Sequence, residues 1–281
     1  MKIIDFRLRP PVGGFLNLRI FSRPDITFSN TRRVGFEPAP SALEKSVEML
    51  FREMDAVGIE RGVVVGRTSG PLGVVSNADV AAVARQYPDR FTPVASVDVS
   101  NRKTAMAQIE EARSLGMSML NLEPGALPNP MHLDDRRIYP IYAYCEDNNI
   151  PVILMSGGSP GPDISYTAPV HLDRVLCDFP DLTVVASHGS WPWVQEAIHI
   201  AYRRPNLYLS PDMYLHELPG MEDYIRAANT FLSDRFLFGT AYPLTPVKEY
   251  TEWFLTLPIK PDVMEKVLYK NAARLLKLEG A

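Results

Sequence analysis

Cysteine is scarce in this chain of 281 residues, which contains only Cys145 and Cys177. Both cysteines fall in segments with a helical pattern, and their spacing matches no metal-binding motif. We therefore expect two reduced thiols rather than a disulfide framework or a zinc site. This usage of cysteine is typical of a cytoplasmic protein.

Long apolar runs and a strong excess of one charge are also missing. No hydrophobic stretch approaches the roughly 20 residues that a membrane-spanning helix needs. Met1-Lys2-Ile3 leads into a predicted strand rather than into a signal peptide. The formal net charge of −4 argues against general binding to nucleic acid or to anionic membranes. We expect neither among the partners.

Several catalytic motifs are absent as well. No Gly-x-Gly-x-x-Gly follows the first predicted strand, which disfavours a dinucleotide-binding fold. No Gly-x-Ser-x-Gly nucleophile elbow occurs either. The loop Ser156-Gly157-Gly158-Ser159 lacks the Gly-Lys-Ser/Thr ending of a phosphate-binding loop. Its backbone N–H groups still suit an anion, so Ser156 is a candidate substrate-binding residue.

Short aliphatic runs alternate with segments of helical periodicity along the whole chain. The predicted strands are 2–6, 62–65, 92–97, 118–122, 151–155, 183–186, 207–209 and 235–238. The predicted helices are 42–57, 78–86, 103–115, 138–148, 169–179, 193–202, 221–231, 247–257 and 262–278. Such alternation gives parallel strands with right-handed crossovers. Eight units favour an α/β fold of the closed (β/α)8 TIM-barrel type, formed by one domain over 1–281.

A long segment, 15–40, follows the first strand and contains several prolines and arginines. We expect it to be a loop that folds over the barrel mouth, as a lid or as a dimer contact. A homodimer or a higher homo-oligomer is the expected assembly.

Ionisable residues gather at the carboxyl ends of the predicted strands, where TIM barrels place their active sites. Arg7 and Arg9 alternate on the first strand, so both side chains point into one region. The other candidates at strand ends or just beyond them are Arg67, Glu123, Ser156, His188, Trp191, Asp212 and Tyr242. Arginine provides permanently charged, bidentate donors, and the sequence therefore favours a small anionic organic substrate.

Five segments carry the motifs of one known family. They are Asp5-Phe6-Arg7-Leu8-Arg9, 149–157 with Met155-Ser156-Gly157, 182–192 with His188-Gly189 and Trp191-Pro192, 235–243 with Gly239-Thr240-Ala241-Tyr242-Pro243, and 270–275. In these segments the chain resembles the amidohydrolase superfamily, in particular the amidohydrolase-related group that includes aminocarboxymuconate-semialdehyde decarboxylase. The resemblance spans the whole chain and implies the same barrel fold.

The resemblance also implies where the family's metal ligands would lie. Those positions are occupied here by Arg7, Arg9, Met155, His188 and Ala241. Arginine has no lone pair to give, and a divalent metal needs at least three good ligands. We therefore expect no metal cofactor at this position. A relocated metal held by Glu123, Asp212 and His188 is an alternative, although no ligand spacing supports it.

The resemblance implies hydrolysis of an ester- or lactone-like bond, or decarboxylation, of a small carboxylated compound. His188, Glu123 and Asp212 are the candidate catalytic residues, and His188 is the best general base or acid among them. The candidate substrate-binding residues are Arg7, Arg9, Arg67, Ser156, Trp191 and Tyr242. Two alternatives stay open: an inactive barrel that binds a small acid or regulates a partner, and internal ion pairs that simply fill an emptied metal site.

Overall fold

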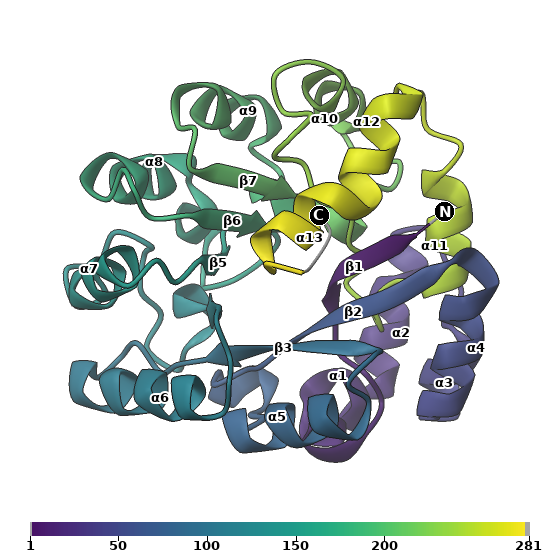
Figure 1. Cartoon of the computed structure of the whole chain (residues 1–281), viewed down its shortest axis with the longest axis horizontal. Coiled ribbons are helices and arrows are strands. Elements are labelled where there is room, and N and C mark those ends of the chain that lie inside the picture. Colours follow the sequence, from purple (N-terminus) through teal and green to yellow (C-terminus); the bar gives the residue numbers. More distant parts are fainter. Residues whose placement is uncertain (1, 279–281) are drawn as a thin grey trace.

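Seven parallel strands curl into a barrel wall, and each strand pairs with the next one along the chain (Figure 1). The computed structural model describes residues 2–278. The strands are β1 Ile3–Leu8, β2 Ile59–Val65, β3 Phe91–Ser96, β4 Leu120–Leu122, β5 Val152–Met155, β6 Val184–Ser187 and β7 Leu207–Ser210. The order follows the sequence because each crossover is helical and returns to the same side of the sheet.

The eighth segment closes the barrel without forming a regular strand. Leu209 of β7 pairs with Phe236, and Leu8 of β1 pairs with Tyr242, each through an isolated parallel bridge. The predicted strand over 235–238 therefore lies where expected, between β7 and β1. It forms isolated bridges, however, and not a regular strand. The Phe238 N–H donates to Val267 O at 3.2 Å in the C-terminal helical region, which interrupts the ladder. The predicted TIM barrel is confirmed.

Helices surround the barrel wall. The α-helices outside residues 19–33 are α3 Pro40–Leu43, α4 Val47–Val57, α5 Asn77–Gln86, α6 Arg102–Ser114, α7 Tyr139–Asp147, α8 Pro169–Asp178, α9 Val194–Arg203, α10 Met221–Ala228, α11 Val247–Phe254, α12 Pro261–Glu265 and α13 Asn271–Leu275. Helix α4 shows why these boundaries arise. The Ser46 hydroxyl accepts from the Met49 N–H at its start. Gly58 ends the helix with a φ of 80°, a backbone conformation that glycine adopts without strain.

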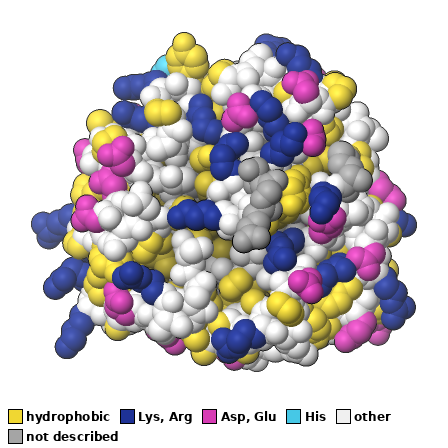
Figure 2. All heavy atoms as spheres, in the orientation of Figure 1, with side chains coloured by type: hydrophobic (Ala, Val, Ile, Leu, Met, Phe, Trp, Pro, Cys, Tyr) yellow, Lys and Arg dark blue, Asp and Glu magenta, His cyan; other side chains and the backbone are white. Residues whose placement is uncertain are grey.

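The barrel interior is apolar and is covered at one end by the C-terminal helix. Its side chains include Phe6, Val65, Ile153 and Val185, which pack with Ala272 of α13. Figure 1 shows α13 crossing in front of the strands, with α1 and α2 on the far side of the barrel. On the face covered by α13, basic and acidic side chains are interspersed (Figure 2). The carboxyl ends of the parallel strands lie at the opposite end of the barrel.

The segment predicted as a loop over 15–40 is largely helical, which corrects that expectation. It contains α1 Arg19–Ser22 and α2 Pro24–Arg33. Pro24 stands in the first turn of α2, where its missing N–H costs no hydrogen bond. His216 Nδ1–H donates to the Val34 carbonyl at 2.7 Å and fixes the end of the segment to the loop after β7. Within residues 2–278 no helix has the length and apolar character needed to cross a membrane.

Candidate active site

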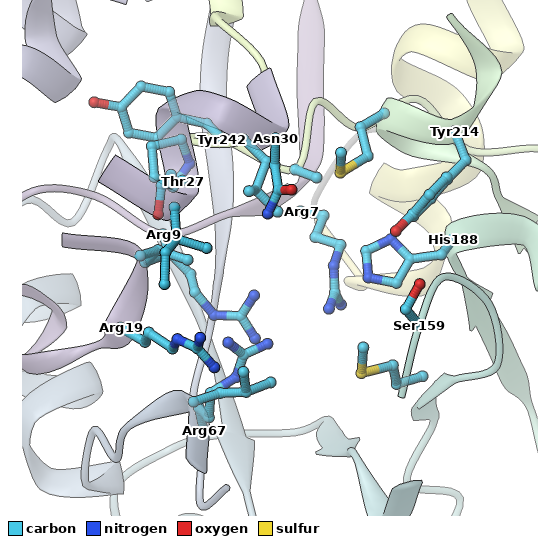
Figure 3. Close-up of a pocket in the computed structure, with 18 residues that line it drawn as sticks. Arg7, Arg9, Arg19, Thr27, Asn30, Arg67, Ser159, His188, Tyr214 and Tyr242 are labelled. Carbon is cyan, nitrogen blue, oxygen red and sulfur yellow. The ribbon is translucent and has the colours of Figure 1, made fainter. Parts of the chain in front are cut away.

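A cavity of about 320 Å³ lies at the carboxyl end of the strands (Figure 3). Arg7, Arg9, Met155, His188 and Ala241 all line it, although they come from four separate parts of the barrel wall. These are the five positions that the family resemblance assigns to metal ligands. The fold therefore brings them together as the sequence comparison implies. Apolar side chains complete the wall, namely Ile20, Ile26, Leu72, Met213, Pro243 and Leu244.

A buried ion-pair network forms one side of the cavity. Glu123, which follows β4, accepts from Arg9 Nη2 at 2.9 Å and from Arg7 Nη2 at 3.4 Å. Arg67 contacts the same carboxylate through both Nε at 2.6 Å and Nη2 at 2.9 Å. Burial raises the pKa of Glu123, but Arg67, Arg9 and Arg7 outweigh it and hold that pKa well below its usual range. The Glu123 carboxylate therefore stays ionised and is held in contact with three guanidinium groups.

One carboxylate cannot neutralise three guanidinium groups, and two of them keep unpartnered donors. Arg7 Nε, Arg7 Nη1 and Arg9 Nε are buried without a hydrogen-bond partner in the described part of the chain. A buried donor without a partner costs free energy, roughly 1–3 kcal/mol and more for a charged group. The surplus positive charge of the three guanidinium groups, which line the cavity, therefore suits an anionic ligand there.

His188 and Asp212 form the opposite side of the cavity. His188 Nδ1 lies 2.9 Å from Asp212 Oδ1, and the His188 backbone N–H donates to Asp212 Oδ2 at 3.2 Å. Burial lowers the pKa of His188 below its usual value of 6.5, and Asp212 offsets only part of that effect. A neutral imidazole with its proton on Nδ1 donates to Asp212 and leaves Nε2 as an acceptor.

The backbone is strained where these side chains are presented. His188 has a φ of 63°, Asp212 a φ of 45° and Ala241 a φ of 59°. Side-chain-bearing residues rarely adopt this left-handed region, and such strain clusters at functional sites. Gly157 permits the close approach of the neighbouring loop, because a Cβ there would lie 2.6 Å from the His188 carbonyl oxygen.

Asp5 fixes the backbone next to the arginine side of the cavity. Its carboxylate accepts from the Thr240 N–H at 2.9 Å, from the Thr240 hydroxyl at 2.5 Å and from the Arg7 N–H at 3.1 Å. Burial raises the pKa of Asp5 to about 6, although these hydrogen bonds act in the opposite direction. Asp5 thus ties the end of β1 to the segment that closes the barrel.

The remaining predicted substrate-binding residues lie in or beside the cavity. Ser156 is buried behind the lining, where its hydroxyl donates to the Ser187 carbonyl at 3.3 Å. Trp191 stacks on Tyr214 with ring centroids 5.0 Å apart and donates from Nε1 to Pro219 O at 3.3 Å. Tyr242 lines the cavity, but its hydroxyl lies 2.9 Å from Ser41 Oγ. The roles of these three residues stay predictions.

Other lining residues were not predicted from the sequence. Arg19, Thr27 and Asn30 reach the cavity from α1 and α2, within the segment that the sequence analysis expected to be a loop. Ser159 belongs to the small-residue loop after β5, and Tyr214 lies two residues after Asp212. Only that short spacing could have drawn attention to Tyr214.

Residues 19–278 match the family model described as Amidohydrolase. The chain belongs to the amidohydrolase family. It is 69% identical to an uncharacterised TIM-barrel protein from Bordetella bronchiseptica, with a TM-score of 0.98 and 99% of each chain covered.

More distant structures share the fold. A 5-carboxyvanillate decarboxylase from Sphingomonas paucimobilis is 15% identical over 98% of this chain and 99% of that one, with a TM-score of 0.69. A dihydroxybenzoic acid decarboxylase from Polaromonas sp. JS666, with bound manganese and an inhibitor, is 17% identical over 100% of this chain and 98% of that one, also with a TM-score of 0.69. No curated protein matches the chain.

A divalent metal does not fit the side chains at the family's metal position. Arg7 and Arg9 present positive charge and no lone pair there, and among the five positions only His188 offers a ligand of the usual kind. Within residues 2–278 no group of three or more His, Cys, Asp or Glu side chains is arranged to hold a metal ion. Glu123 is engaged by arginines instead.

Proposed function

We propose that this protein is an amidohydrolase-related enzyme that hydrolyses an ester or lactone bond in a small carboxylated compound, without a metal at the family's usual position. The observation that carries the proposal is the surplus positive charge around Arg7 opposite the acceptor Nε2 of His188 in one cavity. In Figure 3 the guanidinium of Arg7 and the ring of His188 face each other. The first group suits an anion, and the second suits a proton from water.

The arginine side binds the substrate carboxylate. The guanidinium groups of Arg7 and Arg9, which line the cavity, donate to it, while Glu123 keeps both groups in place. The cavity of about 320 Å³ lies near the lower end of the range for ligand pockets, about 300–1,000 Å³, and its apolar lining fits a small carbon skeleton.

The histidine side activates water. Nε2 of His188 takes a proton as the water oxygen bonds to the carbonyl carbon, and the carbonyl π electrons move to oxygen. Asp212 stabilises the imidazolium that forms, through the Nδ1–H bond. When the tetrahedral intermediate collapses, the bond from carbon to the leaving oxygen breaks and that oxygen takes the proton back from Nε2. One water is consumed, and an acid and an alcohol are formed.

The test is a panel of esters and lactones, each prepared with and without a second carboxylate, assayed with wild-type protein. We expect turnover of carboxylated members only, and a loss of about 10²–10⁴-fold in kcat for His188→Gln. His199→Gln is the matched control, because His199 is exposed on α9 away from the cavity.

Three outcomes would contradict the proposal. Release of carbon dioxide from a carboxylated aromatic without ester hydrolysis would assign decarboxylation instead. Binding of small acids without turnover of any compound would assign a binding protein. Equal activity of His188→Gln and wild type would remove His188 from the chemistry.

A further inference from the structure

Tyr214 is an aromatic residue of the cavity lining that the proposed chemistry has not yet used. It lies in the short helical turn η6 Asp212–Leu215, which also presents Asp212 to His188. The Tyr214 ring meets the His188 ring edge to face, with centroids 5.2 Å apart and an interplanar angle of 82°. Figure 3 shows Tyr214 on the same side of the cavity as His188 and Ser159.

The ring of Tyr214 is held in place by stacking on Trp191. Trp191 stacks on it at 5.0 Å with an interplanar angle of 15°, and the Trp191 indole N–H donates to Pro219 O. A stacked aromatic pair of this kind contributes roughly 0.5–1.5 kcal/mol beyond its buried area. The position of the hydroxyl is therefore set before a ligand binds.

The hydroxyl itself has no hydrogen-bond partner in the described residues 2–278. It lies against Gly158, where an added Cβ would be 2.7 Å from the Tyr214 oxygen, so that only glycine leaves room for it. Burial raises the pKa of Tyr214 to about 12, and the phenol stays protonated at working pH. A neutral donor with a free hydrogen thus lies beside the general base.

We propose that the Tyr214 hydroxyl donates a hydrogen bond to the oxyanion that develops when water attacks the substrate carbonyl beside His188. The inference rests on the proposed hydrolysis and adds a catalytic residue to it. Preorganised donors aimed at developing charge stabilise the transition state more than the ground state. No proton leaves Tyr214 in this step, since the proton cycle runs through His188 alone.

The experiment compares Tyr214→Phe with wild type on a carboxylated aryl ester and a carboxylated alkyl ester. We expect kcat to fall by about 10²–10³-fold, the effect of removing one oxyanion donor, with KM nearly unchanged and the same factor for both esters. A carboxylated phosphonate analogue should bind less tightly by the same factor, whereas the product carboxylate should bind equally well. Tyr202→Phe, a hydroxyl deletion at an exposed site on α9, is the control.

The outcomes separate the two proposals. Unchanged kcat in Tyr214→Phe, with wild type active, would overturn the role of Tyr214 and leave hydrolysis standing. A loss confined to the alkyl ester would make Tyr214 a proton donor to the leaving group and also overturn the oxyanion role. Absence of hydrolysis by wild type would overturn both proposals. A Trp191→Leu variant that lowers kcat partially, while the phosphonate still binds, would support the inference that Trp191 positions the Tyr214 ring.

Discussion

The two sides of the cavity differ in how their charged groups are partnered. On the arginine side three guanidinium groups share the single carboxylate of Glu123, and buried N–H donors are left over. On the histidine side the carboxylate of Asp212 accepts hydrogen bonds from two donors of His188. Only the first side therefore carries surplus positive charge.

In the proposed function this difference gives the two sides different tasks. Surplus cations beside a fixed anion can bind a carboxylate without moving a proton. A neutral imidazole oriented by a carboxylate can move a proton without binding an anion. Arg7 joins the two sides, because its Nε also lies 3.9 Å from Asp212 Oδ2. The proposed anion subsite and the proposed base therefore lie in one small cavity.

The largest expected effect comes from Asp212→Asn. An amide has one acceptor oxygen, so either the His188 N–H or the Nδ1–H would face an NH₂ group, and the useful tautomer would be lost. We expect kcat to fall by about 10⁴-fold. The acid limb of the pH profile should also move to lower pH, because Asp212 raises the pKa of His188. Asp147→Asn, at an exposed site on α7, is the control for pH–rate measurements.

Removing the charge of Glu123 from the arginine side of the cavity should mainly lower stability. Glu123→Gln leaves three buried guanidinium groups without their anion, and we expect the free energy of unfolding to fall by about 3–5 kcal/mol. Glu110→Gln, which breaks an exposed pair with Arg113, should change it by less than about 1 kcal/mol. Urea titration of both variants measures the difference, and equal values would show that the buried network is not stabilising.

Glu123→Gln should also change how stability depends on pH. The pKa of Glu123 is depressed in the folded protein, so its contribution is complete above the unfolded value of 4.5 and is lost as pH falls. Wild-type stability should therefore decrease below pH 4.5 more steeply than that of Glu123→Gln. Parallel curves would contradict the depressed pKa.

Arg7→Lys sharpens the comparison by keeping the charge and removing the fork of donors. A hydrogen bond to a charged group contributes about 1.5–3 kcal/mol, which corresponds to about 10–100-fold weaker binding of a substrate carboxylate. Calorimetric titration with a small carboxylate measures the change, with Arg52→Lys on the exposed face of α4 as control. Unchanged affinity would mean that Arg7 serves only the internal network.

The smallest effect is expected for Tyr242→Phe. The Tyr242 hydroxyl contacts Ser41, whose own hydroxyl donates to Glu53 Oε2 at 2.5 Å. We expect a loss of about 1 kcal/mol in stability and little change in kcat. A large loss of turnover with intact stability would instead place the Tyr242 hydroxyl in substrate binding.

The fold could be predicted because the alternation of apolar strands and amphipathic helices is local. The convergence of Arg7 and Arg9 followed from the two-residue period of a strand, and His188 from its place at a strand end. Glu123 and Arg7 are 116 residues apart, so their ion pair depends on the closed barrel. The helices within 15–40 were missed, because their polar sequence lacks a regular apolar stripe. Homo-oligomer formation stays a prediction.

The most direct test of the account is the rate of hydrolysis of a carboxylated ester or lactone before and after exhaustive chelation, across a range of pH. We predict that chelation leaves the rate unchanged, and that the rate falls at acid pH with an apparent pKa below the usual 6.5 of histidine. Loss of activity on chelation, with recovery on addition of Mn²⁺, would contradict the claim that Arg7, Arg9 and His188 work without a metal.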